Sequence, residues 1–375
     1  MDFLDKLAFE YGLKHTLFFR NIVRHDLYKI YGPDPEDVHE AVLSRLHEFT
    51  DLLKKYLTDS SFPELDVTIK GKKIKPFGTA AGFDKDGRIL KELSYIFGFQ
   101  ESGTVIVHER KGNNRPRVYA DSEQENLYNA QGFPSKGLSY FLENIKEYRS
   151  SGFTKPIYVN VCGLPNDNNF DAAYEELGIL VEALNDYSDG FVWNPFSPNT
   201  ASLKQLRTPE VFRKSSELIR KLSGDKLLLV KMGPYDKNGL NVWLDLTSGF
   251  LEGGGDGLVT VNTYMVPKEE VPSKEWGYPS AGKSGRFLEN YRKNAVVEAR
   301  THFPDAIIFA TGGIYDGDDA YKTFELGADA IEGYTPYTYY GLGLVRKLMK
   351  ETSEMLENYG WKNLEEVRSM PRPIL

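Results

Sequence analysis

Short apolar runs alternate with longer amphipathic segments along most of this chain. From about residue 65, eight runs rich in β-branched and aromatic residues are separated mostly by stretches of helical length. The expected strands are Phe77–Ala80, Glu101–Val105, Ile157–Val161, Phe191–Asn194, Leu227–Val230, Leu258–Val261, Ile307–Ala310 and Ala330–Glu332. The alternation predicts a (β/α)8 barrel, or TIM barrel, over residues 65–375. A doubly wound sheet is the alternative.

The first 60 residues follow a different pattern. Apolar residues recur at helical spacing from Phe3 to Ile30, with lysines and arginines between them. The segment Asp34-Pro35-Glu36-Asp37 then predicts a helix start, with an N-cap carboxylate and proline at the first helical position. We expect residues 1–60 to form an amphipathic helical extension. It either packs on its own domain, which the pattern alone favours, or lies on a membrane surface.

One segment within the barrel region is unusually long between two expected strands. Residues 106–156 are polar and contain several glycines and prolines. Long insertions of this kind often cover an active site. We expect this segment to fold over the barrel mouth as a lid.

Composition and charge argue against several kinds of binding partner and structural site. The formal net charge of −8, without a dense basic cluster, argues against nucleic acid. Cys162 is the only cysteine, which excludes an intrachain disulfide and a cysteine-rich zinc site. The six histidines show no metal-ligand spacing with carboxylates, so no catalytic metal is expected. No run approaches 18 apolar residues, so a spanning helix is not expected.

Polar side chains collect where the predicted strands end. Asn160, Asn194 and Asn262-Thr263 end three of them. The stretch Phe191–Thr200 begins apolar, and Pro198 stops the strand, so that Ser197 lies on a loop. In such barrels the carboxyl ends of the strands carry the chemistry. Amides can bind the N–H and C=O groups of a polar ring while a hydroxyl moves a proton. An ordinary turn is the alternative interpretation.

Two lysines and several glycines add to this set. Lys85 follows the first strand, and Lys231 ends the fifth as either an outward-reaching charge or the partner of a buried anion. Glycine-bearing segments near the end favour a phosphate-bearing cofactor, because barrels commonly bind phosphate after strands seven and eight. These segments are Gly282-Lys283-Ser284-Gly285, Thr311-Gly312-Gly313-Ile314 and Gly333-Tyr334-Thr335.

Taken together, these motifs resemble the dihydroorotate dehydrogenase family, in particular its serine-base, quinone-linked class with an N-terminal helical extension. The resemblance covers nearly the whole chain. It is carried by Asp34-Pro35-Glu36 with His39, Ala80-Ala81-Gly82-Phe83-Asp84-Lys85, Gly112-Asn113-Asn114-Arg115-Pro116-Arg117, Asn129 with Gly132-Phe133, Ser197-Pro198-Asn199-Thr200, Val230-Lys231, Asn262-Thr263 and the closing glycine segments.

The resemblance implies FMN in the barrel mouth and dihydroorotate stacked on it. The implied FMN-binding residues are Ala80, Ala81, Gly82, Thr104, Asn129, Asn160, Asn194, Lys231, Val261, Ser284, Gly285, Gly312, Gly313, Tyr334 and Thr335. Among them, Lys231 would lie near the pyrimidine end of the flavin. The implied substrate-binding residues are Lys85, Asn129, Gly132, Phe133, Asn194, Asn199, Asn262 and Thr263.

The implied reaction is oxidation of dihydroorotate to orotate in de novo pyrimidine (UMP) biosynthesis. Ser197 would be the base that takes the C5 proton, and Thr200 would relay that proton outward through a water. Hydride would leave C6 for FMN. Members of this class pass electrons to a membrane quinone through a tunnel framed by their N-terminal helices. The resemblance therefore implies peripheral membrane association through residues 1–60, with a cytoplasmic location as the alternative.

Four positions depart from the family pattern. Cys162-Gly163-Leu164-Pro165 stands where Gly-Lys-Asn is usual, Pro134 replaces an asparagine, and Pro195-Phe196 precedes Ser197. Ala120 replaces an arginine that faces the quinone in family members. We expect Ala120 to affect the acceptor more than the substrate, and Trp193 and Phe196 to reshape the substrate pocket.

Two further hypotheses therefore stand beside dihydroorotate oxidation. The first keeps the FMN barrel but changes the substrate to another dihydropyrimidine or enone, or changes the acceptor. The second is a flavin-bound or empty barrel that has lost catalysis and serves as a binding module; the retained Lys85 and Ser197 argue against it.

Overall fold

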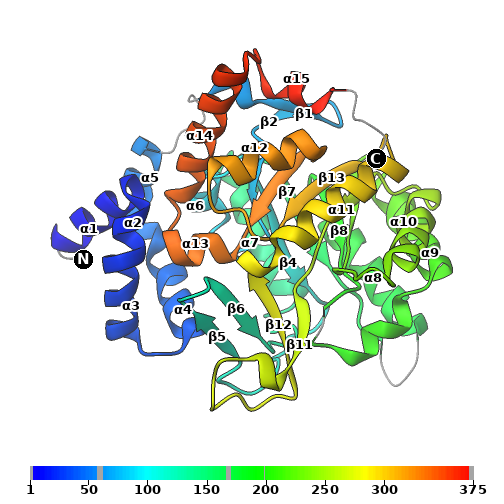
Figure 1. Cartoon of the computed structure of the whole chain (residues 1–375). Coiled ribbons are helices and arrows are strands. Elements are labelled where there is room, and N and C mark those ends of the chain that lie inside the picture. Colours follow the sequence, from blue (N-terminus) through cyan, green and yellow to red (C-terminus); the bar gives the residue numbers. More distant parts are fainter. Residues whose placement is uncertain (1–2, 57–61, 166–169, 198, 371–375) are drawn as a thin grey trace.

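A closed barrel of eight parallel strands forms the centre of the computed structural model, which describes residues 3–56, 62–165, 170–197 and 199–370 (Figure 1). The strands are β3 (Phe77–Thr79), β4 (Phe99–Val105), β7 (Ile157–Val161), β8 (Gly190–Trp193), β9 (Leu227–Lys231), β10 (Gly257–Val259), β13 (Ile307–Thr311) and β14 (Ala330–Gly333). Each coincides with one of the eight predicted runs, so the predicted (β/α)8 barrel is confirmed. Almost every residue in these strands is buried, because helices cover them outside and side chains fill them inside.

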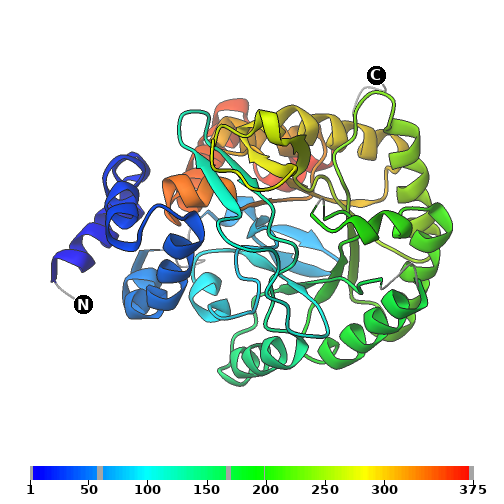
Figure 2. The same cartoon turned by 90° about the horizontal axis from the view of Figure 1, so that it is seen from below.

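Helices surround the barrel in the order that this fold requires (Figure 2). They are α6 (Leu90–Ser94), α7 (Leu138–Ser150), α8 (Phe170–Leu184), α9 (Pro209–Ser223), α10 (Leu240–Glu252), α11 (Glu289–His302), α12 (Gly317–Leu326), α13 (Thr335–Tyr340), α14 (Leu344–Tyr359) and α15 (Leu364–Arg368). Inside the barrel, the Phe309 ring lies 5.0 Å from that of Phe99 and 5.6 Å from that of Tyr158. A Cβ at Gly78 would come within 2.4 Å of the Phe99 ring, so this tight interior requires glycine there.

At the amino end of the barrel, three aspartates make the same set of contacts between neighbouring strands and the outer helices. Each precedes one strand, accepts a hydrogen bond from an N–H of the neighbouring strand, and pairs with an arginine of an outer helix. The sets are Asp189 with Ile157 and Arg149, Asp256 with Leu228 and Arg220, and Asp329 with Ile308 and Arg300. A hairpin of β1 (Val67–Ile69) and β2 (Lys72–Ile74) covers this end, and its Lys70 and Lys72 pair with Asp256 and Asp189.

A small antiparallel sheet stands at the opposite, carboxyl end of the barrel. It consists of β5 (Val118–Asp121), β6 (Asn126–Asn129), β11 (Tyr264–Pro267) and β12 (Ser280–Gly285), in the order β11-β12-β6-β5. The predicted lid, residues 106–156, is therefore divided. Its middle forms the β5–β6 hairpin of this sheet, whereas residues 138–150 form α7 of the outer ring, so the expectation of one covering segment was wrong for that part.

The N-terminal residues form a helical extension beside the barrel mouth (Figures 1 and 2). It comprises α1 (Phe3–Lys14), α2 (Thr16–Phe18), a π-helical turn (Phe19–Val23), α3 (Arg24–Tyr31), α4 (Pro35–Arg45) and α5 (Thr50–Tyr56). The predicted helix start is confirmed: the Asp34 carboxylate accepts a hydrogen bond from the Glu36 N–H at 2.9 Å. Glu36 also pairs with Arg117, which directly precedes β5 of the small sheet, with N–O distances of 2.9 and 3.0 Å. These contacts fix α4 against the barrel mouth.

Candidate functional site

A cavity opens at the carboxyl ends of the barrel strands, between them and the small sheet. All of the predicted site residues line it except Asn160 and Thr200. Because parallel strands end at one rim, residues far apart in the sequence meet there. Their assigned roles remain predictions, but the structure brings them together in one place.

Three ionisable side chains meet at the floor of this cavity. The Lys231 Nζ atom lies 2.6 Å from Glu101 Oε2 and 3.1 Å from Glu332 Oε1. All three residues are buried. Of the two alternatives for Lys231, the partner of a buried anion is therefore the correct one. The two glutamates, on β4 and β14, were not among the predicted site residues.

The pKa values of this triad diverge. Burial raises the pKa of Glu101, but the charge of Lys231 and hydrogen bonds to the carboxylate hold it below its usual range. Burial and the neighbouring Glu101 charge raise the pKa of Glu332 well above its usual range. Burial lowers the pKa of Lys231, and the two carboxyl groups raise it above the usual value on balance. The lysine is therefore an ammonium at neutral pH.

A continuous hydrogen-bond network leads from the triad to the predicted substrate side. Asn160 Nδ2 donates to Glu101, and Asn160 Oδ1 accepts from Thr104 Oγ1 at 2.5 Å. Asn194 Nδ2 donates to Thr104 at 3.1 Å, and Asn194 Oδ1 accepts from Asn262 Nδ2 at 3.1 Å. Asn160 thus lies behind the cavity wall, where it orients other groups. A direct contact between Asn160 and a cofactor, as the resemblance implies, does not follow from this position.

The rim of the cavity is built by the small sheet and the loops beside it. Asn129, at the end of β6, donates to the Gly282 carbonyl of β12 at 3.1 Å and accepts from Asn199 Nδ2 at 2.8 Å. Lys85 lies on the cavity wall, and burial lowers its pKa while the carboxylates of Glu36 and Glu40 oppose that shift. The rim therefore offers amides and a lysine amine to a small polar ring.

Ser197 lies on the loop after β8, buried and facing the cavity. Pro198, expected to end the strand, lies outside the described residues. Thr200 is buried but does not line the cavity, and its Oγ1 has no hydrogen-bond partner among the described residues. A relay through Thr200 would need a further group between the two hydroxyls.

The bulky residues near this loop do not shape the cavity. Trp193 points outward to α9 and α10, with ring distances of 4.8 Å to Phe212 and 6.2 Å to Phe250. Phe196 packs near Phe212 and under the Arg207 guanidinium. The expectation that Trp193 and Phe196 reshape the substrate pocket was therefore wrong. Successive residues of a strand face opposite sides, so Asn194 faces inward where Trp193 faces outward.

The far end of the cavity is formed by glycines and hydroxyls. Gly312 and Gly313 have φ values of 100° and 69°, and a Cβ on Gly313 would come within 2.8 Å of the Glu289 nitrogen. The hydroxyls of Ser284 and Thr335 lie 2.9 Å apart. Behind this end, the buried Arg292 donates to the Gly312 carbonyl at 2.7 Å, and burial lowers its pKa to about 10. A bare backbone, two hydroxyls and a buried cation fit a phosphate group.

A second cavity lies between the extension and the barrel, with mostly apolar walls. Phe9, Leu13, Phe19, Leu27, Val38 and Val42 come from the extension, and Phe83, Val118, Leu127, Tyr337 and Leu342 from the barrel region. It shares Lys85, Val118, Leu127, Gln131 and Tyr334 with the first cavity. His39 also borders it and donates through Nε2 to the Phe83 carbonyl at 2.8 Å.

A third, outer cavity adjoins the second through Arg24 and Tyr28. Ala120, which replaces the family's arginine, lines this outer cavity, and so does Arg24 of α3. The Arg24 guanidinium lies 4.3 Å above the Tyr339 ring and donates to Ser122 Oγ at 3.1 Å. Arg24 therefore supplies a cation beside Ala120, the position at which the resemblance implies an arginine.

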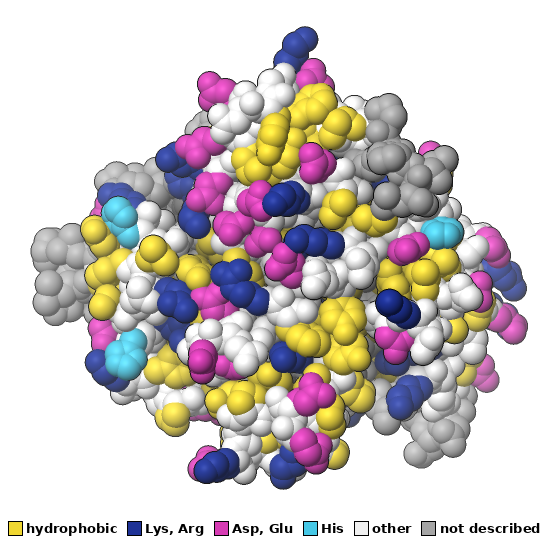
Figure 3. All heavy atoms as spheres, in the orientation of Figure 1, with side chains coloured by type: hydrophobic (Ala, Val, Ile, Leu, Met, Phe, Trp, Pro, Cys, Tyr) yellow, Lys and Arg dark blue, Asp and Glu magenta, His cyan; other side chains and the backbone are white. Residues whose placement is uncertain are grey.

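The outer surface of the extension combines apolar and basic side chains (Figure 3). Tyr11, Leu17, Ile22 and Ile30 are exposed there, with Lys14 and Lys29 nearby in the sequence. Among the described residues, no helix is long and apolar enough to cross a membrane.

Comparisons with known proteins agree with this site. The family model for dihydroorotate dehydrogenase matches residues 64–356. "Dihydroorotate dehydrogenase (quinone)" from Helicobacter acinonychis (strain Sheeba) is 28% identical over 358 residues, which cover 92% of this chain and 98% of that protein. The protein of the same name from Nautilia profundicola (strain ATCC BAA-1463 / DSM 18972 / AmH) is 29% identical over 367 residues, covering 95% and 98%.

A solved structure matches over a similar extent. The Eimeria tenella enzyme, crystallised in complex with ferulenol, has a TM-score of 0.78 and 27% sequence identity, covering 92% of this chain and 97% of that one. The family model alone covers well over half of the chain, so the predicted resemblance is confirmed. The chain belongs to the dihydroorotate dehydrogenase family.

Proposed function

We propose that the protein oxidises dihydroorotate to orotate with bound FMN and passes the electrons to a quinone. The observation that carries this proposal is the meeting, in one cavity, of the Ser197 loop, the amides and Lys85 at one side, and Lys231 and the glycine end at the other. The names of the relatives support the substrate and the acceptor.

The cavity suits FMN along its length. Lys231 would hold the pyrimidine end of the flavin, where an ammonium stabilises negative charge. Ala80, Ala81 and Gly82 would let the flat ring approach the backbone, and the glycine end would hold the phosphate. FMN, when bound, supplies the acceptor for hydride from C6 of the substrate and returns two electrons to the next acceptor.

The protein's own groups bind the substrate and move one proton. Asn129, Asn199 and Asn262 would orient the ring through its N–H and C=O groups, and Lys85 would neutralise its carboxylate. Ser197 would take the proton from C5 as hydride leaves C6, so that the C5–C6 double bond of orotate forms. A serine needs help to act as a base, and in this proposal Thr200 and a water would take the proton on from it.

The apolar second cavity is the proposed entry for the quinone. It shares a wall with the flavin cavity and leads outward to Arg24. Exposed apolar residues of the extension, including Leu17 and Ile30, would rest in a membrane surface beside basic side chains. The protein would then be peripherally membrane-associated through residues 1–60.

Acceptor-resolved turnover tests this proposal. Purified protein should be yellow, and anaerobic dihydroorotate should bleach it. Reoxidation should be fastest with a quinone when quinone, fumarate, NAD and oxygen are compared. If a different dihydropyrimidine bleaches the flavin faster, the substrate is wrong, and Pro134 on the cavity wall is the first residue to revert. Fractionation without detergent tests the membrane contact.

A further inference from the structure

The triad at the cavity floor holds one more acidic group than its single lysine can neutralise. Lys231 contributes one positive charge, and Glu101 and Glu332 contribute two carboxyl groups, all of them buried. Two ionised carboxylates would leave a net negative charge away from water, which is strongly unfavourable. One proton on one of the two carboxyl groups makes the triad neutral.

Hydrogen-bond donors decide which carboxyl group carries that proton. Glu101 accepts from Lys231 at 2.6 Å, from the Ala81 N–H at 3.2 Å, and from Asn160 Nδ2. Donors of this number stabilise an ionised carboxylate.

Glu332 is placed differently. Its Oε1 accepts from Lys231 at 3.1 Å, and its carboxyl group lies within hydrogen-bonding reach of the Glu101 carboxylate. Its buried Oε2 meets no donor among the described residues. An ionised oxygen without a donor would be costly there, whereas a protonated one is itself a donor.

Only one of the two carboxyl groups belongs to the wall of the flavin cavity. Glu332 lines that cavity together with Lys231, whereas Glu101 lies behind them. We propose that Glu332 is a neutral carboxylic acid at physiological pH, and that it presents a hydrogen-bond donor to the pyrimidine end of the flavin. The FMN contact rests on the proposed function, but the protonation of Glu332 does not.

This assignment gives Glu332 a defined effect on the cofactor. A neutral donor beside Lys231 stabilises negative charge that develops on the flavin ring without placing an opposing carboxylate there. The protein would therefore bind reduced FMN more tightly, relative to oxidised FMN, than it would with an ionised Glu332. Glu332 would in this way raise the midpoint potential of the bound flavin.

Two matched amide substitutions separate the alternatives. In Glu332→Gln, a neutral donor replaces a neutral donor, so the ratio of affinities for reduced and oxidised FMN should stay within about threefold of the parent. In Glu101→Gln, Lys231 has only Glu332 as a partner, so Glu332 should ionise and the ratio should fall about tenfold or more, as expected when a hydrogen bond to a charged group is lost. The midpoint potential of the bound flavin gives this ratio.

The opposite pattern would overturn the assignment. If Glu332 were the ionised group, Glu332→Gln would raise the ratio and Glu101→Gln would leave it unchanged. A protonated-carboxyl band in the infrared spectrum of FMN-free protein at pH 7, lost in Glu332→Gln, provides a second readout. Failure to bind FMN would refute the proposed function but leave the infrared test standing, and absence of the band would refute the protonation even in a yellow, active enzyme.

Discussion

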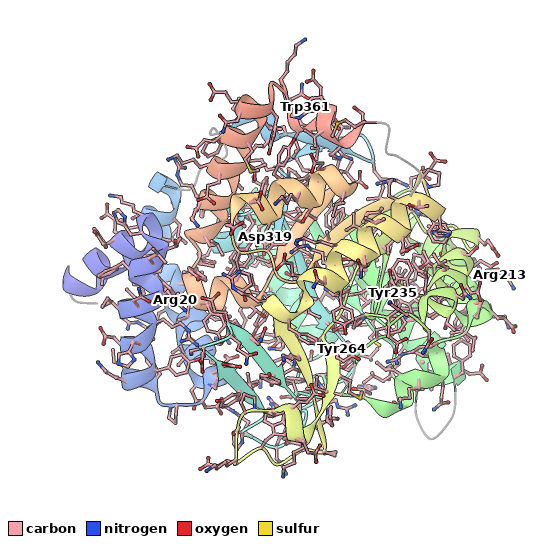
Figure 4. The ribbon with its side chains drawn as sticks, in the orientation of Figure 1. Arg20, Arg213, Tyr235, Tyr264, Asp319 and Trp361 are labelled. Atoms are coloured by element: carbon pink, nitrogen blue, oxygen red, sulfur yellow. The ribbon has the colours of Figure 1, made fainter. Side chains whose placement is uncertain are left out.

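Arg20 lies in the N-terminal extension (Figure 4), and its Nε atom is 2.7 Å from Oε1 of Glu125, in the turn between β5 and β6. Glu125 also accepts hydrogen bonds from Arg286 and Tyr340, each at 2.6 Å. One largely buried carboxylate thus joins the extension, the small sheet and the barrel helices.

Arg20→Ala should therefore loosen the extension more than it destabilises the barrel. The Arg20 side chain is 32% exposed, so its ion pair should contribute about 1 kcal/mol or less to global unfolding. Limited proteolysis of the extension should become severalfold faster, and the KM for quinone should rise. Lys29→Ala, which removes an exposed pair with Asp26, is the control. Equal proteolysis rates in both variants would contradict the role of Arg20.

Arg24→Ala should impair the second half-reaction alone. Arg24 borders both the apolar cavity and the outer cavity that Ala120 lines, so its loss should raise the KM for quinone about tenfold, as for one hydrogen bond to a charged group. Anaerobic flavin reduction by dihydroorotate should remain at the parent rate. Adding Ala120→Arg to this variant should restore part of the lost affinity. Slower flavin reduction would show instead that the variant disturbs the substrate side.

Ser197→Ala should slow flavin reduction by dihydroorotate about 10²- to 10⁴-fold, because a positioned general base contributes that much. Stopped-flow bleaching of the anaerobic enzyme measures the effect. Binding of orotate should change little, because the amides and Lys85 remain. A variant that bleaches as fast as the parent would remove Ser197 from the mechanism.

Thr200→Val tests the proton relay separately. Valine has nearly the same shape, and the Thr200 hydroxyl has no partner among the described residues, so stability should be unchanged or slightly higher. If the relay exists, flavin reduction should slow and its solvent isotope effect should change. Unaltered reduction would leave Ser197 to exchange its proton by another route.

His39 should make stability depend on pH in a defined window. Burial and the Lys85 charge lower its pKa from 6.5 to about 4. The unfolded chain therefore binds more protons than the folded protein between these values. The contribution of neutral His39 to the free energy of unfolding is therefore fully present above pH 6.5. It is lost as the pH falls toward 4, by at most about 3 kcal/mol.

The comparison with His39→Gln isolates this contribution. In the parent protein, Asp84 has the opposite effect on the pH dependence of stability. Burial raises the pKa of Asp84 to about 6, so protonation of this carboxyl group favours the folded state as the pH falls. The difference in free energy of unfolding between parent and variant removes the Asp84 contribution, and it should shrink from pH 7 to pH 4.5. A difference that stays constant would mean that His39 titrates normally.

The barrel could be predicted from the sequence because each strand is a local apolar run. The helix start at Asp34 was equally local, since the capping residue and Pro35 are neighbours. By contrast, β5, β6, β11 and β12 are short, and they form one sheet only through pairings between distant segments, such as Gly282 with Asn129. No local pattern predicts such pairings.

The site was predicted unevenly for a related reason. Residues at strand ends, such as Asn194 and Lys231, followed from the rule that parallel strands end at one rim. The burial of Glu101 and Glu332 did not follow from this rule, because carboxylates are rarely buried and usually mark the exposed end of a strand. A charged residue inside an otherwise apolar strand was the available signal. The outward direction of Trp193 agrees with strand alternation, because the next residue, Asn194, faces the cavity.

The asparagines around Asn194 line only the first of the two inner cavities, although the cavities share one wall, and this has a consequence for inhibition. A compound that fills the apolar cavity contacts the extension and leaves the amides around Asn194 free, so it should be non-competitive toward dihydroorotate. Its selectivity should depend on the extension, where Arg24 and Leu27 stand, more than on the barrel. A pharmacology directed at this cavity could therefore distinguish this enzyme from relatives that share its chemistry.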